Sequence, residues 1–372
     1  MKQMKVKLED VCERGTSNLK QSDIAKTSGD YPIYGASGYI GNTNFYHQEK
    51  PYVAVVKDGA GVGRAVLYPA NSSVIGTMQY LLPKDNVLPK YLFYVVSYMH
   101  LEKYFTGATI PHIYFKDYKN EEFNLDLLER QAEIVEILEK CEKNIKKRKQ
   151  EIQLLDDLIK ARFVELFGNL DINDKGWNEC SLGEACDKVI RYPTFYGMDY
   201  LETGTRVIRI GNILEDGHME LADENYVFVY DGVNEDFPET VMELNDIVMA
   251  VRGDGSAAKR IGIIREEELI DSNISPNLIR IKAGKELEPL FLFYYLTGDV
   301  GQRRLDAYVN KTAKKNIAAK DIVKVIVPIP PLLVQKQFTD FVNQVDKSKV
   351  VVQKALDEAQ LLFDSLMQEY FG

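Results

Sequence analysis

Glycines, histidines and cysteines are the residues whose spacing could support catalysis or metal binding in this chain. Gly59, Gly61 and Gly63 could cradle a phosphate, but the run lacks the Lys-Ser/Thr of a P-loop and no helix follows it, so a hairpin turn is favoured. The four histidines are scattered, and Cys180 and Cys186 have no second pair, so neither set predicts a metal site. Because no methyltransferase, helicase or nuclease signature is present either, the sequence predicts no catalytic and no metal-binding residues.

Basic and amide side chains instead gather at the predicted ends of strands and in turns. Arg and Asn read base edges with paired hydrogen bonds, whereas Lys mostly contacts phosphates. For each residue alone a solvated loop position is the simpler interpretation, but the set recurs in both halves of the chain and predicts a DNA-binding face. The candidates are Tyr34, Ser37, Lys57, Arg64, Thr109, His112, Arg191, Arg209, Asn212, Arg252, Lys259, Arg260, Lys314, Lys315 and Asn316.

Short strands and turns must position these residues. In the first half the pattern predicts a hairpin of strands 52–56 and 64–67, strands at 78–82 and 113–115, and a helix at 88–98 that starts near Pro89. In the second half it predicts a helix at 289–296 and strands at 206–210, 246–250, 259–264, 277–281 and 322–326. Pro330 and Pro331 are expected to stop the last strand, and the second long helix is expected to start just after them.

A long helix is predicted at 128–168, because apolar residues recur there in alternating steps of four and three, the heptad period of a helix packed along a partner. Its seam positions are Ile134, Leu138, Cys141, Ile145, Arg148, Ile152, Leu155, Ile159, Arg162 and Leu166. The same register recurs 204 residues later, at Phe338, Val342, Val345, Lys349, Val352, Leu356, Ala359, Phe363, Leu366 and Tyr370. For the three charged seam residues, buried stems with heads in water are favoured over polar devices that set the register.

An internal duplication follows from these two helices. Each begins near a glutamine (Gln131, Gln335) and ends in Phe-Gly, and Leu182-Gly-Glu-Ala-Cys186 echoes Leu8-Glu-Asp-Val-Cys12. The second copy carries about 30 extra residues, mostly before its middle. The expected fold is α+β: two mixed α/β domains, 1–127 and 169–331, separated by long helices, 128–168 and 332–372. These helices should form an antiparallel coiled coil with a pseudo-two-fold relation between the copies, which would bring Gly372 near the N-terminal segment.

Composition narrows the class of protein. The formal net charge is −10, with +1 in residues 1–127 and −9 in residues 169–331, so charge alone is not expected to hold DNA. The four cysteines show no CxxC pairing, no signal peptide begins the chain, and no run of about 18 apolar residues is present. A reduced cytoplasmic protein without a membrane span is expected.

The whole chain resembles the specificity subunits of Type I restriction–modification enzymes, in which two target recognition domains alternate with two long helices. The order of local signatures carries the resemblance. These are Leu8-Glu-Asp-Val-Cys12, Tyr31-Pro-Ile-Tyr-Gly-Ala-Ser-Gly38, Val207-Ile-Arg-Ile-Gly-Asn-Ile213, Asp246-Ile-Val-Met-Ala250 and Ile329-Pro-Pro-Leu-Leu-Val-Gln335. The first copy departs from this pattern, since residues 124–131 lack the prolines that precede the second helix.

The resemblance implies a non-catalytic DNA-binding subunit in which each recognition domain reads one half of a split target. It implies that the helices set the spacing and dock two modification (methyltransferase) subunits, with restriction motor subunits as further partners. This chain would hold no cofactor; S-adenosylmethionine, ATP and Mg²⁺ would belong to partner subunits. Two alternatives stay open from the residues alone: a methyltransferase-related enzyme chain without recognisable catalytic signatures, and a coiled-coil scaffold that does not bind DNA.

Overall fold

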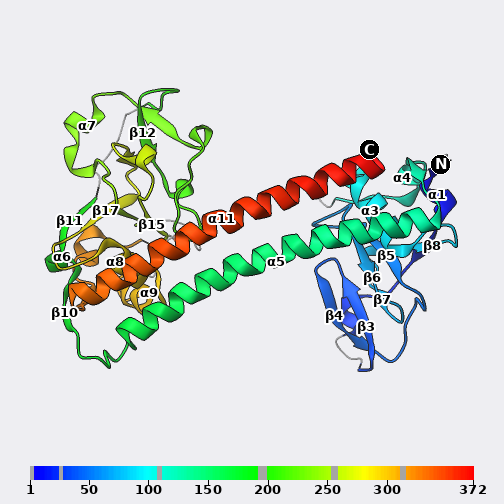
Figure 1. Ribbon diagram of the computed structural model, residues 1–372, viewed down its shortest axis with the longest axis horizontal. Helices are drawn as coiled ribbons and strands as arrows, with labels where there is room; N and C mark the ends of the chain where they lie inside the picture. Colours follow the sequence, from blue (N-terminus) through cyan, green and yellow to red (C-terminus); the bar gives the residue numbers. More distant parts are fainter. Residues whose placement is uncertain (1–3, 25–27, 107–110, 192–198, 253–258, 311–315) are drawn as a thin grey trace. The chain divides into compact units, whose positions relative to one another are not determined.

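The protein divides into two compact units in the computed structural model, which describes residues 4–24, 28–106, 111–191, 199–252, 259–310 and 316–372 (Figure 1). The first unit comprises residues 1–152 and 351–372, and the second comprises residues 153–350. Each unit therefore contains one of the two predicted α/β domains and parts of both long helices.

Three small sheets build the first unit. Their strand orders are β2-β8-β5-β6, β4-β3-β7 and β1-β9. The strands are β1 (Met4–Lys7), β2 (Cys12–Thr16), β3 (Tyr31–Gly35), β4 (Gly38–Thr43), β5 (Tyr52–Val56), β6 (Ala65–Tyr68), β7 (Ser73–Val74), β8 (Met78–Pro83) and β9 (Glu122–Leu125). The short helices are α1 (Leu8–Val11), α2 (Gln21–Ile24), α3 (Pro89–Tyr98) and α4 (Phe115–Tyr118).

Strand β5 is apolar throughout because both of its faces are buried. Val53 and Val55 belong to the core beneath α3, whereas Tyr52, Ala54 and Val56 belong to the core that Val74 of the three-stranded sheet shares. This alternation is the two-residue period of a strand. It places the four-stranded sheet between a helix and a second sheet. The predicted hairpin is confirmed, since β5 and β6 pair antiparallel.

The second unit repeats this plan. Its sheets have the orders β11-β17-β14-β15, β13-β12-β16 and β10-β18. The strands are β10 (Asn178–Ser181), β11 (Cys186–Arg191), β12 (Thr205–Ile208), β13 (Val227–Val229), β14 (Ile247–Ala250), β15 (Ile261–Ile263), β16 (Asn273–Ile274), β17 (Leu278–Ala283) and β18 (Ile326–Ile329). The short helices are α6 (Leu182–Ala185), α7 (Val233–Asp236), α8 (Pro289–Thr297), α9 (Asp299–Asp306) and α10 (Ala319–Ile322).

Strand registers show where the second copy is longer. Ile33 of β3 pairs with β7 as Val207 of β12 pairs with β16, and these two residues are 174 positions apart. Val53 of β5 and Ile247 of β14 occupy equivalent places opposite β8 and β17, and they are 194 positions apart. Twenty of the extra residues thus lie between Val207 and Ile247, which confirms an insertion before the middle of the second copy.

The long helices are α5 (Leu128–Phe167) and α11 (Leu332–Phe371). In the first unit Ile134 and Leu138 of α5 share a core with Met367 and Phe371 of α11. In the second unit Phe163, near the other end of α5, lies edge-on against Phe338 at the start of α11, with ring centroids 5.2 Å apart. The start of one helix thus packs on the end of the other, so the predicted antiparallel pairing is confirmed.

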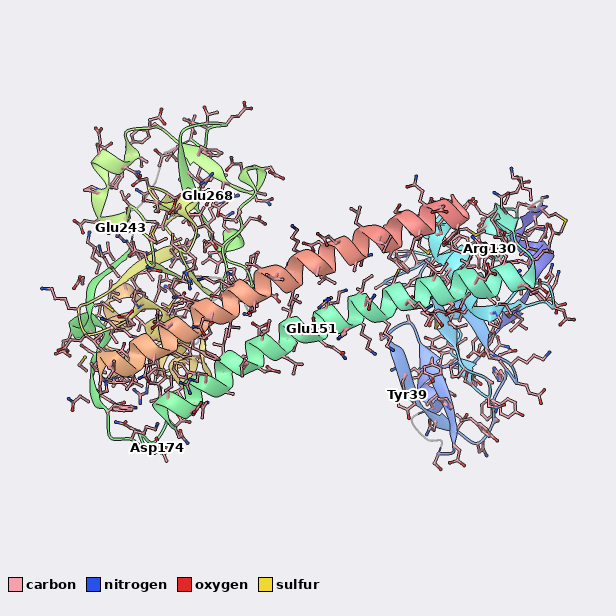
Figure 2. The ribbon with its side chains drawn as sticks, viewed as in Figure 1. Tyr39, Arg130, Glu151, Asp174, Glu243 and Glu268 are labelled. Carbon is pink, nitrogen blue, oxygen red and sulfur yellow. The ribbon has the colours of Figure 1, made fainter. Side chains whose placement is uncertain are left out.

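Burial follows the predicted seam. All twenty seam residues are buried or half-buried, whereas apolar residues off the seam, such as Leu154 and Leu361, are exposed. Lys349 joins the helices through an ion pair with Asp156, and Arg162 lies over the ring of Phe341 while bonding Glu165. Arg148 pairs with Glu151 on its own helix, and Glu151 is labelled in Figure 2. Phe371 shares its core with Val6, which confirms that the C-terminus lies near the N-terminal segment.

The two long helices are entered in the same way despite the missing prolines in the first copy. The fully buried Gln131 accepts a hydrogen bond from the Leu88 amide (2.8 Å) and donates to the carbonyls of Asn86 and Asp126. Gln335, also fully buried, accepts from the Glu288 amide (2.8 Å) and donates to the carbonyls of Glu286 and Pro330. Each glutamine therefore ties the start of its long helix to the start of α3 or α8.

Two strand predictions were wrong. The segment 113–115 leads into helix α4, because Phe115 packs on Tyr118 one turn later and only the Ile113 amide bonds a neighbouring chain segment. The strand predicted at 322–326 begins only at Ile326 and runs through Pro328. Proline is tolerated there because β18 pairs with a single neighbour, β10, so that the missing N–H breaks no second ladder.

Candidate nucleic-acid interface

Arg252 and Asn316 of the second unit meet across an isolated antiparallel bridge. Arg252 follows β14 after one residue, and the flanking bond from the Ile317 amide to the Val251 carbonyl (3.0 Å) holds the bridge. Directly opposed residues have Cβ atoms about 5 Å apart. Two candidates separated by 64 positions are thus neighbours, and both are of the type that reads base edges.

Asn277 joins this group, although the sequence placed it only as the start of a strand. Its carbonyl accepts a hydrogen bond from the Val251 amide at 2.9 Å, so Asn277 lies beside the residue that precedes Arg252. The Asn277 side chain is exposed. Its position at a strand end beside the candidates is the signal that sequence reasoning could have used.

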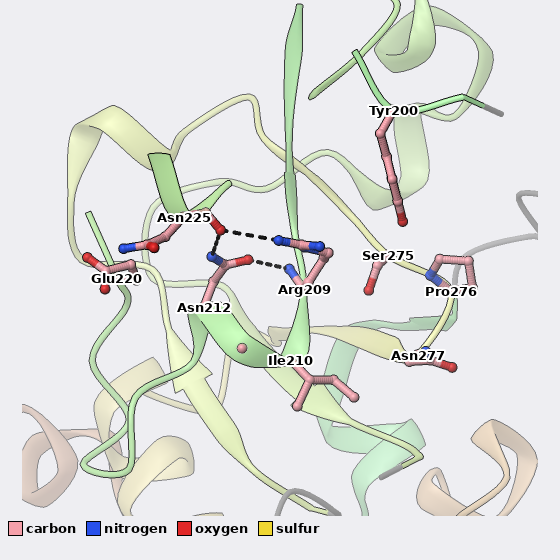
Figure 3. A pocket seen from close by; sticks show the side chains of 10 residues that line it. Tyr200, Arg209, Ile210, Asn212, Glu220, Asn225, Ser275, Pro276 and Asn277 are labelled. Atoms are coloured by element: carbon pink, nitrogen blue, oxygen red, sulfur yellow. Dashed lines mark hydrogen bonds between the residues drawn. The ribbon is translucent and has the colours of Figure 1, made fainter. Parts of the chain in front are cut away.

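A pocket of about 680 Å³ opens next to Asn277 (Figure 3). Residues 209–212 and 275–277 supply most of its wall. The Ser275 amide donates a hydrogen bond to the Ile208 carbonyl (2.9 Å) and so joins the two segments. Arg191 lies at the same edge, with its Nε donating to the Pro276 carbonyl at 3.3 Å. The lining residues are Tyr200, Arg209, Ile210, Gly211, Asn212, Glu220, Asn225, Ser275, Pro276 and Asn277.

Asn212 has a structural role in this wall. It is 2% exposed, its Oδ1 accepts from the Arg209 amide (2.8 Å), and its Nδ2 donates to the Asn225 carbonyl (2.9 Å). These bonds, drawn as dashed lines in Figure 3, close the short 3-10 turn that ends the predicted strand at Ile208. The amide of Asn212 is therefore committed to positioning Arg209.

Lys259 and Arg260 also bond within the fold. Lys259 pairs with Asp306 at 2.6 Å, and Arg260 donates to the Ile213 carbonyl at 3.2 Å. Both side chains thus tie β15 and its approach to neighbouring segments. Three further candidates, Thr109, Lys314 and Lys315, lie outside the described residues.

The first unit places its candidates around the equivalent strand ends. His112 bridges Asp58 across an isolated antiparallel pair, and its Nδ1 contacts the Asp58 carboxylate. The Ile113 amide bonds the Lys57 carbonyl at 3.0 Å, as the Ile317 amide bonds Val251 in the second unit. The pair Asp58–His112 therefore occupies the place of Arg252–Asn316, with an acid where the second unit has an arginine.

The β3–β4 hairpin carries the remaining candidates of the first unit. Ser37 is exposed at its tip, and the Arg64 guanidinium donates to the Ala36 carbonyl beside it. Tyr34 stacks on Tyr68 with ring centroids 4.3 Å apart, and burial raises the pKa of the Tyr34 hydroxyl. Tyr39, which sequence reasoning missed, is 62% exposed at this hairpin (Figure 2). Strand ends thus present polar and aromatic side chains in both units.

Among the residues that the structure describes, no three His, Cys, Asp or Glu side chains cluster as a metal site would require. No helix in those parts of the chain is long and apolar enough to cross a membrane. The candidate site therefore consists of hydrogen-bonding and aromatic side chains on loops that two sheets position.

Two repeated α/β units with polar strand ends and long paired helices define a modular recognition protein. The chain belongs to the family whose model is described as the Type I restriction modification DNA specificity domain, which matches residues 1–155 and 174–359. The matched ranges cover one copy of the repeat each. The chain is accordingly a DNA sequence-recognition subunit of a Type I restriction–modification system, and its family is non-catalytic.

Individual relatives agree with this family. The chain is 22% identical over 329 residues to the Type I restriction enzyme MjaVIII specificity subunit of Methanocaldococcus jannaschii, covering 83% of this chain and 75% of that protein. It is 26% identical over 210 residues to the EcoBI specificity subunit of Escherichia coli, covering 55% of this chain and 42% of that one. The crystal structure of the S subunit from M. genitalium shares the fold, with a TM-score of 0.61, 17% identity, and coverage of 100% and 96% of the two chains.

Proposed function

We propose that each unit reads one half of a bipartite double-stranded DNA target. The observation that carries this proposal is the duplication. Both units contain the same three sheets, the same bridge at a strand end and the same glutamine at the start of a long helix. Residues 1–127 and 169–331 would be the two recognition domains, and 128–168 and 332–372 the spacer helices.

A domain exchange tests the bipartite proposal. Residues 1–127 are replaced by the equivalent segment of another family member, and the methylated sites are read by methylome sequencing of cells that carry the complete system. We expect one half of the target to change while the other half and the spacer stay the same. Simultaneous change of both halves would contradict separate reading by two domains.

The long helices would set the distance between the half-sites. An α-helix rises about 1.5 Å per residue, so one heptad added to each helix lengthens it by about 10 Å and preserves the seam. At about 3.4 Å per base pair, a spacer longer by about 3 base pairs is expected with unchanged half-site bases. An active complex that keeps the original spacing would contradict the role of the helices as a ruler.

Exposed apolar residues on the helices support docking of two modification subunits, with restriction motor subunits as additional partners. Leu154 (65% exposed) and Leu158 lie one turn apart on α5, and Leu361 (72% exposed) and Leu362 lie on α11, all outside the seam. A contiguous apolar patch on a protein surface is a mark of a protein–protein interaction site. Leu154→Glu together with Leu158→Glu should abolish co-purification of a modification subunit, whereas Gln153→Glu on the same helix should not.

Catalysis would then belong to the partners. S-adenosylmethionine, ATP and Mg²⁺ would be bound by the modification and motor subunits, and this chain would act with them in the cytoplasm, where the DNA is. Assays of the purified chain for methyl transfer, ATP hydrolysis and DNA cleavage test this division. Turnover that persists through an additional purification step would contradict it.

A further inference from the structure

Backbone hydrogen bonds hold together the segments that form the pocket beside Asn277. The parallel pairing of β12 with β16 holds Ile208 against Ile274, and the Ser275 amide adds a further bond to the Ile208 carbonyl. On the other side, the bond from the Val251 amide to the Asn277 carbonyl anchors the pocket to the end of β14. Because backbone hydrogen bonds hold the segments that carry Arg209 and Asn277, both side chains are presented at defined places.

The two side chains keep hydrogen-bonding capacity for a ligand. The Arg209 guanidinium has five donors, of which Nη2 makes a long bond of 3.3 Å to the Asn225 carbonyl. The bond between Asn212 Oδ1 and the Arg209 amide holds the backbone beneath that side chain. Among the described residues, the Asn277 side chain has no hydrogen-bond partner, and it is exposed. Tyr200, 55% exposed, closes the rim with an aromatic ring and a hydroxyl.

The pocket depends on residues that the first unit does not have. Equivalent strand registers place Gly35 of the first unit where the second has Arg209, and Thr77 where it has Asn277. Glu220 and Asn225, which also line the pocket, lie in the segment between Val207 and Ile247, where the second copy is twenty residues longer. The pocket is therefore a feature of the second copy and not of the shared frame.

We propose that this pocket is the base-reading centre of the second unit, with Arg209 and Asn277 as its specificity-determining residues. Arg209 would donate two hydrogen bonds to O6 and N7 of a guanine, and Asn277 would pair with N6 and N7 of an adenine. Arg252 and Asn316, at the adjoining bridge, would extend the contact along the groove. The inference rests on the proposed function and adds to it which residues specify bases of the second half-site.

The test uses the complete complex with its modification subunits and methylome sequencing of each variant. Arg209→Ala is expected to reduce discrimination at one position of the second half-site about 5- to 150-fold, the effect of losing one bidentate base contact. Asn277→Asp is expected to shift preference at another position from adenine toward cytosine, because a carboxylate accepts from the cytosine amino group. The first half-site should be unchanged in both variants.

Matched controls separate reading from folding and from general affinity. Arg303→Ala removes an exposed arginine paired with Asp171, and Asn178→Ala removes an exposed asparagine of β10; neither residue lines the pocket, and both variants should keep the original motif. Arg209→Lys keeps the positive charge but cannot make the paired hydrogen bonds of a guanidinium. It should therefore reduce discrimination at the position expected for Arg209→Ala, and it provides the test if the alanine variant does not fold.

Three outcomes overturn the inference. An unaltered motif in Arg209→Lys and Asn277→Asp would show that neither residue reads a base. Weaker methylation of all sites without a change in the motif would make Arg209 a phosphate contact. A wild-type complex that methylates no bipartite motif would overturn the proposed function and this inference with it.

Discussion

The two units place different side chains at equivalent positions of the four-stranded sheet. The first unit has a pair of tyrosines there, and the second has a buried ion pair. In the first unit Tyr52 precedes Val53 on β5, and Tyr80 of β8 lies next to it with ring centroids 5.0 Å apart. In the second unit the equivalent positions are Asp246, before Ile247, and Arg280 of β17. Asp246 is 2% exposed and Arg280 is 1% exposed, and Arg280 Nε donates to Asp246 Oδ2 at 2.8 Å.

Each solution satisfies its buried polar groups. The Tyr80 hydroxyl bonds the Val74 amide (2.9 Å), and the Tyr52 hydroxyl lies 2.9 Å from Ser72 Oγ. Arg280 donates through Nη2 to Glu243 (2.7 Å) and through Nη1 to the Glu239 carbonyl (3.0 Å), which ties the segment before β14 to the sheet. The same arrangement of strands therefore tolerates either an aromatic pair or an ion pair, provided that every buried donor and acceptor is paired.

The largest expected effect comes from breaking the buried ion pair. Arg280→Met leaves the Asp246 carboxylate buried without its partner, which should lower the free energy of unfolding of the second unit by about 3–5 kcal/mol. Urea unfolding of the full chain, followed by fluorescence of its one tryptophan, Trp177, reports on this unit. Adding Asp246→Leu should recover most of the loss, because it removes the orphaned charge. A single variant that unfolds like the wild type would contradict the comparison.

The next largest effect comes from removing the buried glutamine at the start of each long helix, and it should be equal in the two units. Gln131→Ala and Gln335→Ala each remove three hydrogen bonds at a buried helix start, at a cost of about 2–3 kcal/mol. Hydrogen exchange at the Leu88 amide should accelerate only in the first variant, and exchange at the Glu288 amide only in the second. Glu133→Ala, on the exposed face of α5, serves as the control. Unequal losses would show that the shared contact does not stabilise both copies alike.

A smaller effect is expected from the tyrosine pair. Tyr80→Phe keeps the ring packing and removes the hydroxyl that bonds the Val74 amide, so it should cost about 1–2 kcal/mol. Thermal unfolding of the full chain by circular dichroism measures the loss, and the exposed Tyr39→Phe provides the matched control. A loss of stability as large as that of Arg280→Met would mean that the tyrosine pair and the ion pair are equally sensitive to substitution.

The smallest effect depends on pH. Lys282 and Arg280 lower the pKa of Glu243 from 4.5 to about 2, so its ionised form stabilises the fold above pH 4.5 and that stability is lost as the pH falls toward 2. Because Glu243 is 52% exposed, the contribution should stay below about 1 kcal/mol. Burial raises the pKa of the neighbouring Asp246, so Glu243→Gln is needed to isolate the Glu243 contribution. The urea midpoint between pH 6 and pH 3 should fall less in this variant than in the wild type.

Local patterns in the sequence were sufficient for much of the architecture. The heptad seam, the strands at 52–56 and 78–82, and the helices that follow Pro89 and Pro289 depend on residues close in sequence, so their periodicity predicted them. The duplication also predicted the antiparallel helices, because a repeated register in one chain requires the second helix to return along the first. Leu8–Cys12 and its echo at 182–186 likewise adopt the same short helix and strand.

Tertiary structure alone decided which polar residues come together and which form hydrogen bonds within the fold. Asn212 and Arg209 have similar sequence contexts and both line the pocket, yet the Asn212 amide is buried in bonds to the backbone, whereas the Arg209 guanidinium keeps donors for a ligand. Asn277 lies beside Val251, the residue before Arg252, because strand order and register bring β14 beside β17, and no local pattern encodes that order. The exchange of Tyr52 and Tyr80 for Asp246 and Arg280 has the same cause, since a partner across strands is defined only once the sheet has formed.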